Sequence, residues 1–161
     1  MLQTESGRRK FERHGTWLVL LVAAFTRLFA LGQPHELVFD ETYYVKDAWT
    51  LSANGYESAW PDNANDDFNS GKPNGFLDAA SFVVHPPLGK WLIALGMRTF
   101  GGGNPFGWRI VVALAGIALV WLTMKLGTRL LNSPVWGAVA GLLLAIDGQA
   151  IVMSRNALLD G

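Results

Sequence analysis

Two acidic residues, Asp40 and Glu41, stand side by side shortly after the first apolar segment of the chain. Adjacent side chains point in different directions on a helix or a strand, so these two cannot face each other across one bond as a glycosidase pair does. One carboxylate could act as a base while the other binds substrate or fixes the backbone. The alternative is structural: Asp40 caps a helix and Glu41 is an acid in its first turn, both favoured by the helix dipole.

A second candidate is the run His85-Pro86-Pro87-Leu88-Gly89-Lys90, which predicts a rigid turn that opens a helix. Proline lacks the backbone N–H that is left unpaired at a helix start, so it costs nothing there. In a functional interpretation His85 and Lys90 lie at a membrane surface, where a lipid phosphate would be found. In the alternative interpretation they only anchor the helix at the interface.

Five further ionisable residues lie within or at the ends of apolar segments: Arg27, Arg109, Asp147, Arg155 and Asp160. Ionisable groups in a membrane are costly and seldom face lipid. Arg27 and Asp147 could form a buried structural ion pair. The Arg109 side chain could extend to the polar membrane interface, and Arg155 and Asp160 could be ordinary loop charges. If these cations instead lie near a carboxylate at one surface, they would suit a site that binds a phosphorylated lipid or transfers a group from it.

Three long apolar blocks must position these residues, at 16–31, 109–126 and 135–153. A helix rises about 1.5 Å per residue and the hydrocarbon core is about 30 Å thick, so each block reaches or nearly reaches across. We therefore expect an all-α, multi-pass membrane protein with three transmembrane helices, rather than three core helices of a soluble domain. The shorter stretch 88–100 carries two cations and is predicted to lie in the interface, with Trp91, Leu92 and Leu95 on its apolar side.

The composition excludes several classes of protein. The 161 residues include no cysteine, which rules out a disulfide scaffold and a thiolate zinc site. Lys and Arg number 13, and so do Asp and Glu, which argues against nucleic acid as a partner. Charged residues make up 16% of the chain, below the roughly 25% usual in soluble domains.

Basic residues predict the orientation of the chain in the membrane. They are concentrated in the N-terminal segment 1–15 and around the link 127–134, so we expect both to be cytoplasmic. The 77-residue segment 32–108 holds nine acidic and four basic residues and is expected to be an external catalytic loop. Residues 154–161 then begin a further external part. A cleaved secretory signal is the alternative to an uncleaved first anchor.

Three motifs together resemble those of the protein O-mannosyltransferases, which depend on dolichyl- or polyprenyl-phosphate-mannose and form glycosyltransferase family 39 of the GT-C superfamily. The motifs are Phe39-Asp40-Glu41, the His85–Lys90 run, and Ser154-Arg155-Asn156-Ala157-Leu158-Leu159-Asp160. Their order and placement match over roughly residues 16–161, although the Asn- and Asp-rich middle of the loop matches no known motif. An Asp-Glu pair alone is weak evidence, since it recurs across GT-C enzymes.

The resemblance implies a GT-C membrane enzyme of the cell membrane with its site at the external face. It implies transfer of mannose from polyprenyl-phosphate-mannose to Ser or Thr hydroxyls of secreted or membrane proteins, with inversion at the anomeric carbon. Asp40 would then be the base, because a base helps a weak nucleophile to displace a phosphate. Glu41 would position the acceptor or the loop.

The same resemblance suggests roles for the charged residues. Arg109 is expected to meet the donor phosphate. The other candidates for donor binding are His85, Lys90 and Arg155. The residues expected to support the site are Arg27, Asp147 and Asp160. For Arg27 the resemblance implies an architectural role.

Family members are much longer, so the chain is expected to be the N-terminal part of an enzyme and inactive by itself. Two alternatives are another GT-C transferase that uses a lipid-phosphate sugar, and a non-enzymatic three-span scaffold. No cofactor is expected to be required, although Asp40, Glu41, Asp47 and His85 could supply hard ligands to a divalent metal. The expected partners are the lipid donor, the acceptor proteins and membrane lipid; dimerisation is left open.

Overall fold

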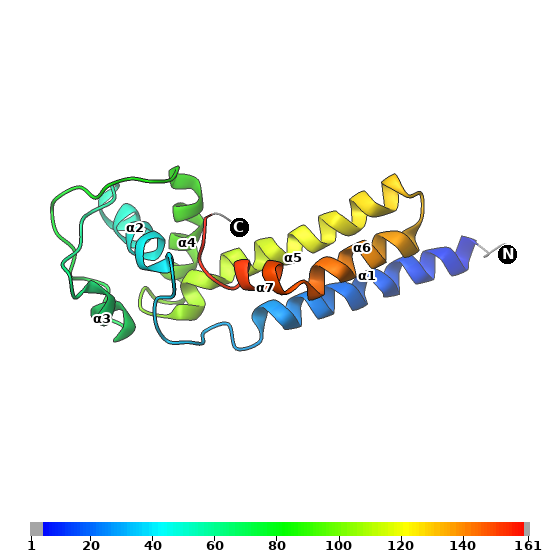
Figure 1. The fold of residues 1–161 in the computed structure, drawn as a ribbon, viewed down its shortest axis with the longest axis horizontal. Coiled ribbons are helices and arrows are strands. Elements are labelled where there is room, and N and C mark those ends of the chain that lie inside the picture. Colours follow the sequence, from blue (N-terminus) through cyan, green and yellow to red (C-terminus); the bar gives the residue numbers. More distant parts are fainter. Residues whose placement is uncertain (1–4, 160–161) are drawn as a thin grey trace. The chain divides into compact units, whose positions relative to one another are not determined.

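The computed structural model describes residues 5–159, and the side chains of residues 14–159. Regular structure in this part is helical apart from one isolated β-bridge between Ser58 and Ala80. Figure 1 shows the helices in chain order: α1 (Glu5–Leu28), α2 (Glu41–Asn54), α3 (Ala64–Asn69), α4 (Pro87–Phe100), α5 (Pro105–Leu130), α6 (Pro134–Ile146) and α7 (Gly148–Met153).

The chain divides into two compact units. The helical unit comprises the described parts of Met1–Phe29 and Leu114–Val152, and the loop unit those of Ala30–Ala113 and Met153–Gly161. Each unit has a buried apolar cluster of its own. By residue number α5 contributes to both units, so each unit is described separately.

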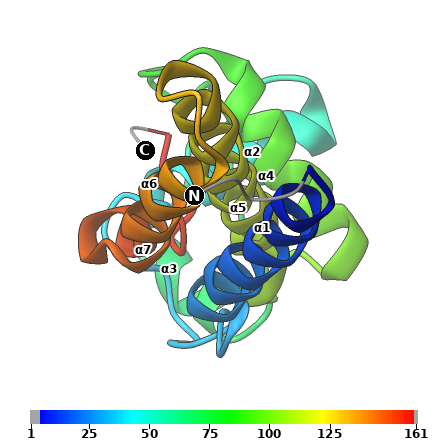
Figure 2. The same ribbon diagram turned by 90° about the vertical axis from the view of Figure 1, so that its right-hand side faces the viewer.

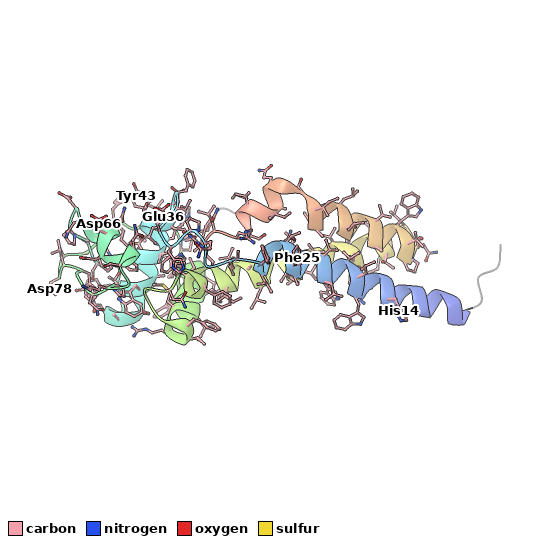
Figure 3. All side chains as sticks on the ribbon, turned by 90° about the horizontal axis from the view of Figure 1, so that it is seen from below. His14, Phe25, Glu36, Tyr43, Asp66 and Asp78 are labelled. Atoms are coloured by element: carbon pink, nitrogen blue, oxygen red, sulfur yellow. The ribbon has the colours of Figure 1, made fainter. Side chains whose placement is uncertain are left out.

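In the helical unit, α6 lies alongside α1, as Figures 1 and 2 both show. Its core takes residues from α1, α5 and α6: Val19, Ala23, Val120, Met124 and Ala145. The outer surface of α1 is apolar as well: the side chain of Phe25, marked in Figure 3, is 65% exposed and stacks on Phe29. Exposed aromatic side chains on a helix with a buried apolar core suit contact with lipid.

Small residues bring α6 close to α5 in this unit. Gly137 and Gly141 are buried on α6. A Cβ atom at Gly137 would overlap Thr128, and one at Gly141 would overlap the side chain of Met124. Such close approach at small residues is typical of helices that pack within a membrane.

Among the described residues, one helix is long and apolar enough to cross a membrane. This helix is α5, with 26 residues, and it contains the expected span 109–126. The other apolar helices are shorter, namely His14–Leu28 within α1 and α6. The bounds of the first expected span, 16–31, differ from those of the helix, since α1 begins at Glu5 and ends at Leu28. Three spans stay a prediction.

The expected segment 135–153 is not one continuous helix. The backbone of Asp147 is extended, with φ −64° and ψ 122°, and separates α6 from α7. Its carboxylate accepts a hydrogen bond of 2.7 Å from the backbone N–H of Ala150. Aspartate is a preferred residue at a helix N-terminus for this reason, so its side chain favours a new start over continuation.

In the loop unit, α2 packs against α4, and the core also takes Phe68 from α3 and Trp108 from α5. The helix expected at 88–100 is present as α4, which begins after Pro86; its place in the interface stays a prediction. One side of α4 enters the core through Ile93, Ala94 and Met97. Its other side exposes the predicted apolar residues Trp91, Leu92 and Leu95.

Candidate active site

Glu41 and Arg109 form a buried ion pair in the loop unit. Nη2 of Arg109 donates to Oε2 of Glu41 at 2.7 Å, and Nε donates to Oε1 at 2.8 Å. The side chains are 0% and 1% exposed. Two parallel hydrogen bonds between a guanidinium and a carboxylate are the strongest form of such a pair. The first residue of α2 is thereby fixed to α5.

The remaining donors of Arg109 bind the segment that leads to α2. Nη1 donates to the carbonyl oxygens of Leu31 (3.3 Å) and Pro34 (3.0 Å), and Nη2 to that of Glu36 (3.0 Å). With the two bonds to Glu41, these use all five N–H donors of the guanidinium. A donor phosphate at Arg109, as the sequence predicts, would have to displace partners of this set.

Glu41 also connects the first and third sequence motifs. Its Oε2 accepts a hydrogen bond from the backbone N–H of Val38 at 3.1 Å. Its Oε1 accepts one from the backbone N–H of Ala157 at 2.8 Å. One buried carboxylate therefore holds its own loop, Arg109 and the segment that carries Arg155 in one place.

Asp40 stands at the N-cap position of α2, with φ −73° and ψ −4°, but its side chain makes no capping hydrogen bond. Its backbone carbonyl accepts the N–H groups of Tyr43 and Tyr44 at 3.0 and 3.1 Å. The preceding Phe39 has φ 54° and a side chain that is 73% exposed, and such a backbone is uncommon outside glycine. The Asp40 carboxylate is half-buried, and it makes no hydrogen bond within residues 5–159.

His85 is held by a tyrosine that the sequence analysis did not single out. The hydroxyl of Tyr44 and Nε2 of His85 share a hydrogen bond of 2.9 Å, and the rings meet edge to face at 5.1 Å. Tyr44 lies on α2 one turn after Asp40, a spacing that puts two side chains on the same helix face. That spacing was the available signal in the sequence.

Lys90 lies in a buried cluster with two carboxylates. Its Nζ donates to Asp47 at 3.0 Å and to Glu57 at 2.7 Å, and the Lys90 side chain is 0% exposed. The cluster joins α2, α4 and the segment after α2. In this structure Lys90 therefore contacts carboxylates, because it lies on the core side of α4. Glu57 lies in an irregular segment and gave no sequence signal.

Burial raises the pKa of Asp47 above its ordinary value of 3.8, although the hydrogen bond and the charge of Lys90 oppose the rise. The folded protein therefore keeps the Asp47 proton at a higher pH than the unfolded chain does. Below pH 3.8 the proton on Asp47 makes its full contribution to the free energy of unfolding. This contribution is lost as the pH rises through the pKa of Asp47 in the folded protein.

Asp47→Asn is expected to reduce this fall in stability, because the variant has no proton to lose at this position. The measurement is the thermal midpoint of the full-length protein in detergent, from pH 4 upward by about one unit at a time. Asp78→Asn, at an exposed position marked in Figure 3, is the matched control. An equal pH dependence in wild type and Asp47→Asn would contradict the assignment.

Arg155, in the third motif, is half-exposed in the loop unit. Its Nη2 donates to the carbonyl oxygen of Ala30 at 3.3 Å. The chain at 30–41 is therefore bound by two arginines, Arg109 and Arg155. Asp160, the last candidate of this motif, lies outside the described residues.

Arg27 belongs to the helical unit and is 1% exposed. Its Nη1 donates to the carbonyl oxygen of Ala145 at 3.1 Å, and its Nη2 to that of Leu144 at 3.2 Å. These carbonyls lie in the last turn of α6, where a helix has unpaired acceptors and a cation is favoured. The contacts fit the architectural role expected for Arg27. Asp147 is exposed and directly precedes α7, where it accepts a hydrogen bond from the backbone N–H of Ala150.

Among the side chains that the structure describes, those of residues 14–159, no three His, Asp or Glu lie close enough to hold a metal ion. Three of the four residues named as conceivable ligands have other partners. Glu41 is paired with Arg109, Asp47 with Lys90, and His85 with Tyr44.

Comparison with known proteins agrees with the motifs. Residues 84–160 match the family described as dolichyl-phosphate-mannose-protein mannosyltransferase. The polyprenol-phosphate-mannose--protein mannosyltransferase of Mycobacterium tuberculosis is 41% identical over 150 residues, which is 91% of this chain and 25% of that protein. The Mycolicibacterium smegmatis protein of the same name is 38% identical over 148 residues, or 90% and 25%.

A different transferase matches over a shorter stretch. The undecaprenyl phosphate-alpha-4-amino-4-deoxy-L-arabinose arabinosyl transferase 1 of Pseudomonas fluorescens is 47% identical over 73 residues, which is 43% of this chain and 13% of that protein. No solved structure matches significantly.

The predicted resemblance is confirmed: the chain is similar to protein mannosyltransferases over about nine-tenths of its own length. It spans about a quarter of the length of the mycobacterial relatives.

Proposed function

We propose that the protein transfers mannose from a polyprenyl-phosphate-mannose donor to Ser or Thr hydroxyls of secreted or membrane proteins, as part of a longer enzyme. The mycobacterial relatives are mannosyltransferases by name. The observation that carries the proposal is the Glu41 carboxylate, which binds both Arg109 and the third motif. Asp40 precedes Glu41 in the chain, and Arg155 lies two residues before Ala157, which supports assigning both residues to one site.

In the proposed reaction, Asp40 takes the proton of the acceptor hydroxyl as its oxygen attacks the anomeric carbon of mannose. The bond between that carbon and the phosphate oxygen breaks, and the lipid phosphate leaves with the electron pair. Attack from the opposite face inverts the anomeric carbon, so no covalent intermediate on the protein is needed. Asp40 suits the role because its carboxylate has no hydrogen bond within the described chain.

Of the four cations or potential cations expected at the donor phosphate, two have geometry that suits this contact. Arg155 is half-exposed, and His85 is half-buried and oriented by Tyr44. We assign these two to the phosphate. The fully bonded Arg109 and the buried Lys90 are assigned to positioning α2 and α4.

The proposed topology follows the basic residues. The N-terminus and the link between α5 and α6 are cytoplasmic, and residues 32–108 face outward. The apolar length of α5 supports a membrane protein; the two further spans and the orientation belong to the proposal. Protease accessibility of residues 54–80 in sealed vesicles tests it, and cleavage only from the cytoplasmic side would contradict it.

The function is tested by supplying the full-length protein with polyprenyl-phosphate-mannose and two kinds of acceptor. Ser- and Thr-containing peptides should receive mannose, whereas glycolipid acceptors should not. Transfer to a glycolipid alone would favour the other candidate, a lipid-phosphate-sugar transferase with a lipid acceptor, which the shorter match to the arabinosyl transferase represents.

Tyr44→Phe is expected to raise the donor KM of the full-length enzyme about two- to tenfold, the value of one lost hydrogen bond. The variant keeps the buried ring but loses the hydroxyl that orients His85. Tyr43→Phe is the matched control, because the neighbouring Tyr43 side chain, marked in Figure 3, is 65% exposed. Equal donor KM values for the two variants would contradict the positioning role of Tyr44.

A further inference from the structure

A cavity of about 150 Å³ lies within the helical unit, remote in sequence from every motif discussed above. Residues from three helices line it: Thr16, Trp121, Met124, Lys125, Thr128 and Pro134. A cavity of comparable size holds a molecule the size of benzene. Its lining combines the Lys125 cation and the Thr16 hydroxyl with apolar side chains, which suits a small anionic group attached to a lipid; the Thr128 hydroxyl donates to the carbonyl oxygen of Met124 at 2.8 Å.

Lys125 is the cation of this cavity. Its side chain is exposed and lies over the ring of Trp121, with Nζ 5.6 Å from the ring centroid. Within the described part of the chain, Lys125 makes no ion pair. Its charge is therefore available to an anion at the mouth of the cavity, whereas Lys90 and Arg109 are paired.

The surroundings of the cavity indicate where in the membrane it lies. Lys125 and Thr128 belong to the last turns of the membrane-length helix α5, and Pro134 is the first residue of α6. Apolar side chains beside it are exposed, among them Leu122 and Leu126. An exposed apolar surface beside a cation at the end of such a helix corresponds to the level of lipid head groups.

We propose that this cavity binds the phosphate head group of an anionic phospholipid, with Lys125 as the counter-ion and the Thr16 hydroxyl as a hydrogen-bond donor. The acyl chains lie along the exposed apolar side chains of α5. Basic pockets between membrane helices recognise anionic head groups in this way. The proposed topology would place this cavity at the inner leaflet, so its location rests on that topology. The cavity itself takes no part in mannose transfer.

The test is binding of phosphatidylglycerol to the full-length protein in a neutral detergent, measured by native mass spectrometry. Phosphatidylglycerol should bind more tightly than phosphatidylcholine. Lys125→Gln should weaken phosphatidylglycerol binding about fivefold, the value of one lysine near a phosphate surface. Arg129→Gln removes the same charge one turn away, at an exposed residue that does not line the cavity, and should retain wild-type binding.

Three results would overturn the proposal. The first is phosphatidylglycerol binding by Lys125→Gln that equals wild type, as expected if another helix of the longer protein fills the cavity. The second is an equal loss in Arg129→Gln, which would indicate general surface charge. The third is full competition by soluble glycerol phosphate, which would indicate a site for free phosphate.

Thr16→Val provides a second variant that keeps the charge of the cavity, should Lys125→Gln fail to fold. It removes a hydroxyl group with little change in size and should weaken phosphatidylglycerol binding about two- to tenfold. Unchanged binding by this variant also counts against the proposal. Lipid binding is measured without donor or acceptor, so failure here is distinct from failure of the proposed mannose transfer.

Discussion

Asp40→Asn in the full-length protein should lower the rate of mannose transfer by about 10²- to 10⁴-fold, the usual contribution of a general base. Asparagine has the size of aspartate but cannot take the proton of the acceptor hydroxyl. The structure should tolerate the change, because the Asp40 carboxylate is half-buried and makes no hydrogen bond within residues 5–159. Membrane insertion and the thermal midpoint should therefore stay at wild-type values.

The rate of Asp40→Asn is measured as labelled mannose transferred to a Ser- or Thr-containing peptide at saturating donor. Asp66→Asn is the matched control, since Asp66 is exposed on α3 and is marked in Figure 3 at the surface of the loop unit. It should transfer mannose normally. Normal transfer by a well-inserted Asp40→Asn protein would remove the proposed base.

Glu41→Gln should destabilise the full-length protein by about 3–5 kcal/mol, because it leaves Arg109 buried without its counter-charge. Both side chains are almost completely inaccessible, so water cannot replace the lost carboxylate. The neutral amide also cannot accept the full set of bonds from Arg109, Val38 and Ala157. Mannose transfer should fall with stability, because Asp40 is the next residue along the chain.

The loss in Glu41→Gln is measured by chemical unfolding in detergent, beside Glu36→Gln as the exposed control. The control should stay within about 0.5 kcal/mol of wild type. The double variant Glu41→Gln/Arg109→Met should lose less than the sum of its single changes, since residues in contact are coupled. Additive losses in this cycle would contradict the ion pair.

Several features could be predicted because they depend on residues close together in sequence. Pro86 and Pro87 predict the start of α4, and the long apolar run predicts α5. The sequence also predicted that Arg109 and other cations gather near a carboxylate at one surface. The structure shows that Glu41, rather than Asp40, is the residue that contacts Arg109.

Other features depend on contacts between distant segments that no local pattern records. Lys90 was expected at a phosphate, but it lies on the core side of α4, where Asp47 and Glu57 neutralise its charge.

The break at Asp147 could have been anticipated, because aspartate followed by glycine disfavours a continuous helix. The apolar residues on both sides favoured one long span instead.

The most direct test of Asp40 as the base is a single-turnover experiment on the full-length Asp40→Asn protein with polyprenyl-phosphate-mannose already bound. The variant should bind the donor as tightly as wild type does. It should transfer mannose to an added peptide at least about a hundredfold more slowly. Transfer at the wild-type rate from the same amount of bound donor would show that Asp40 is not the base.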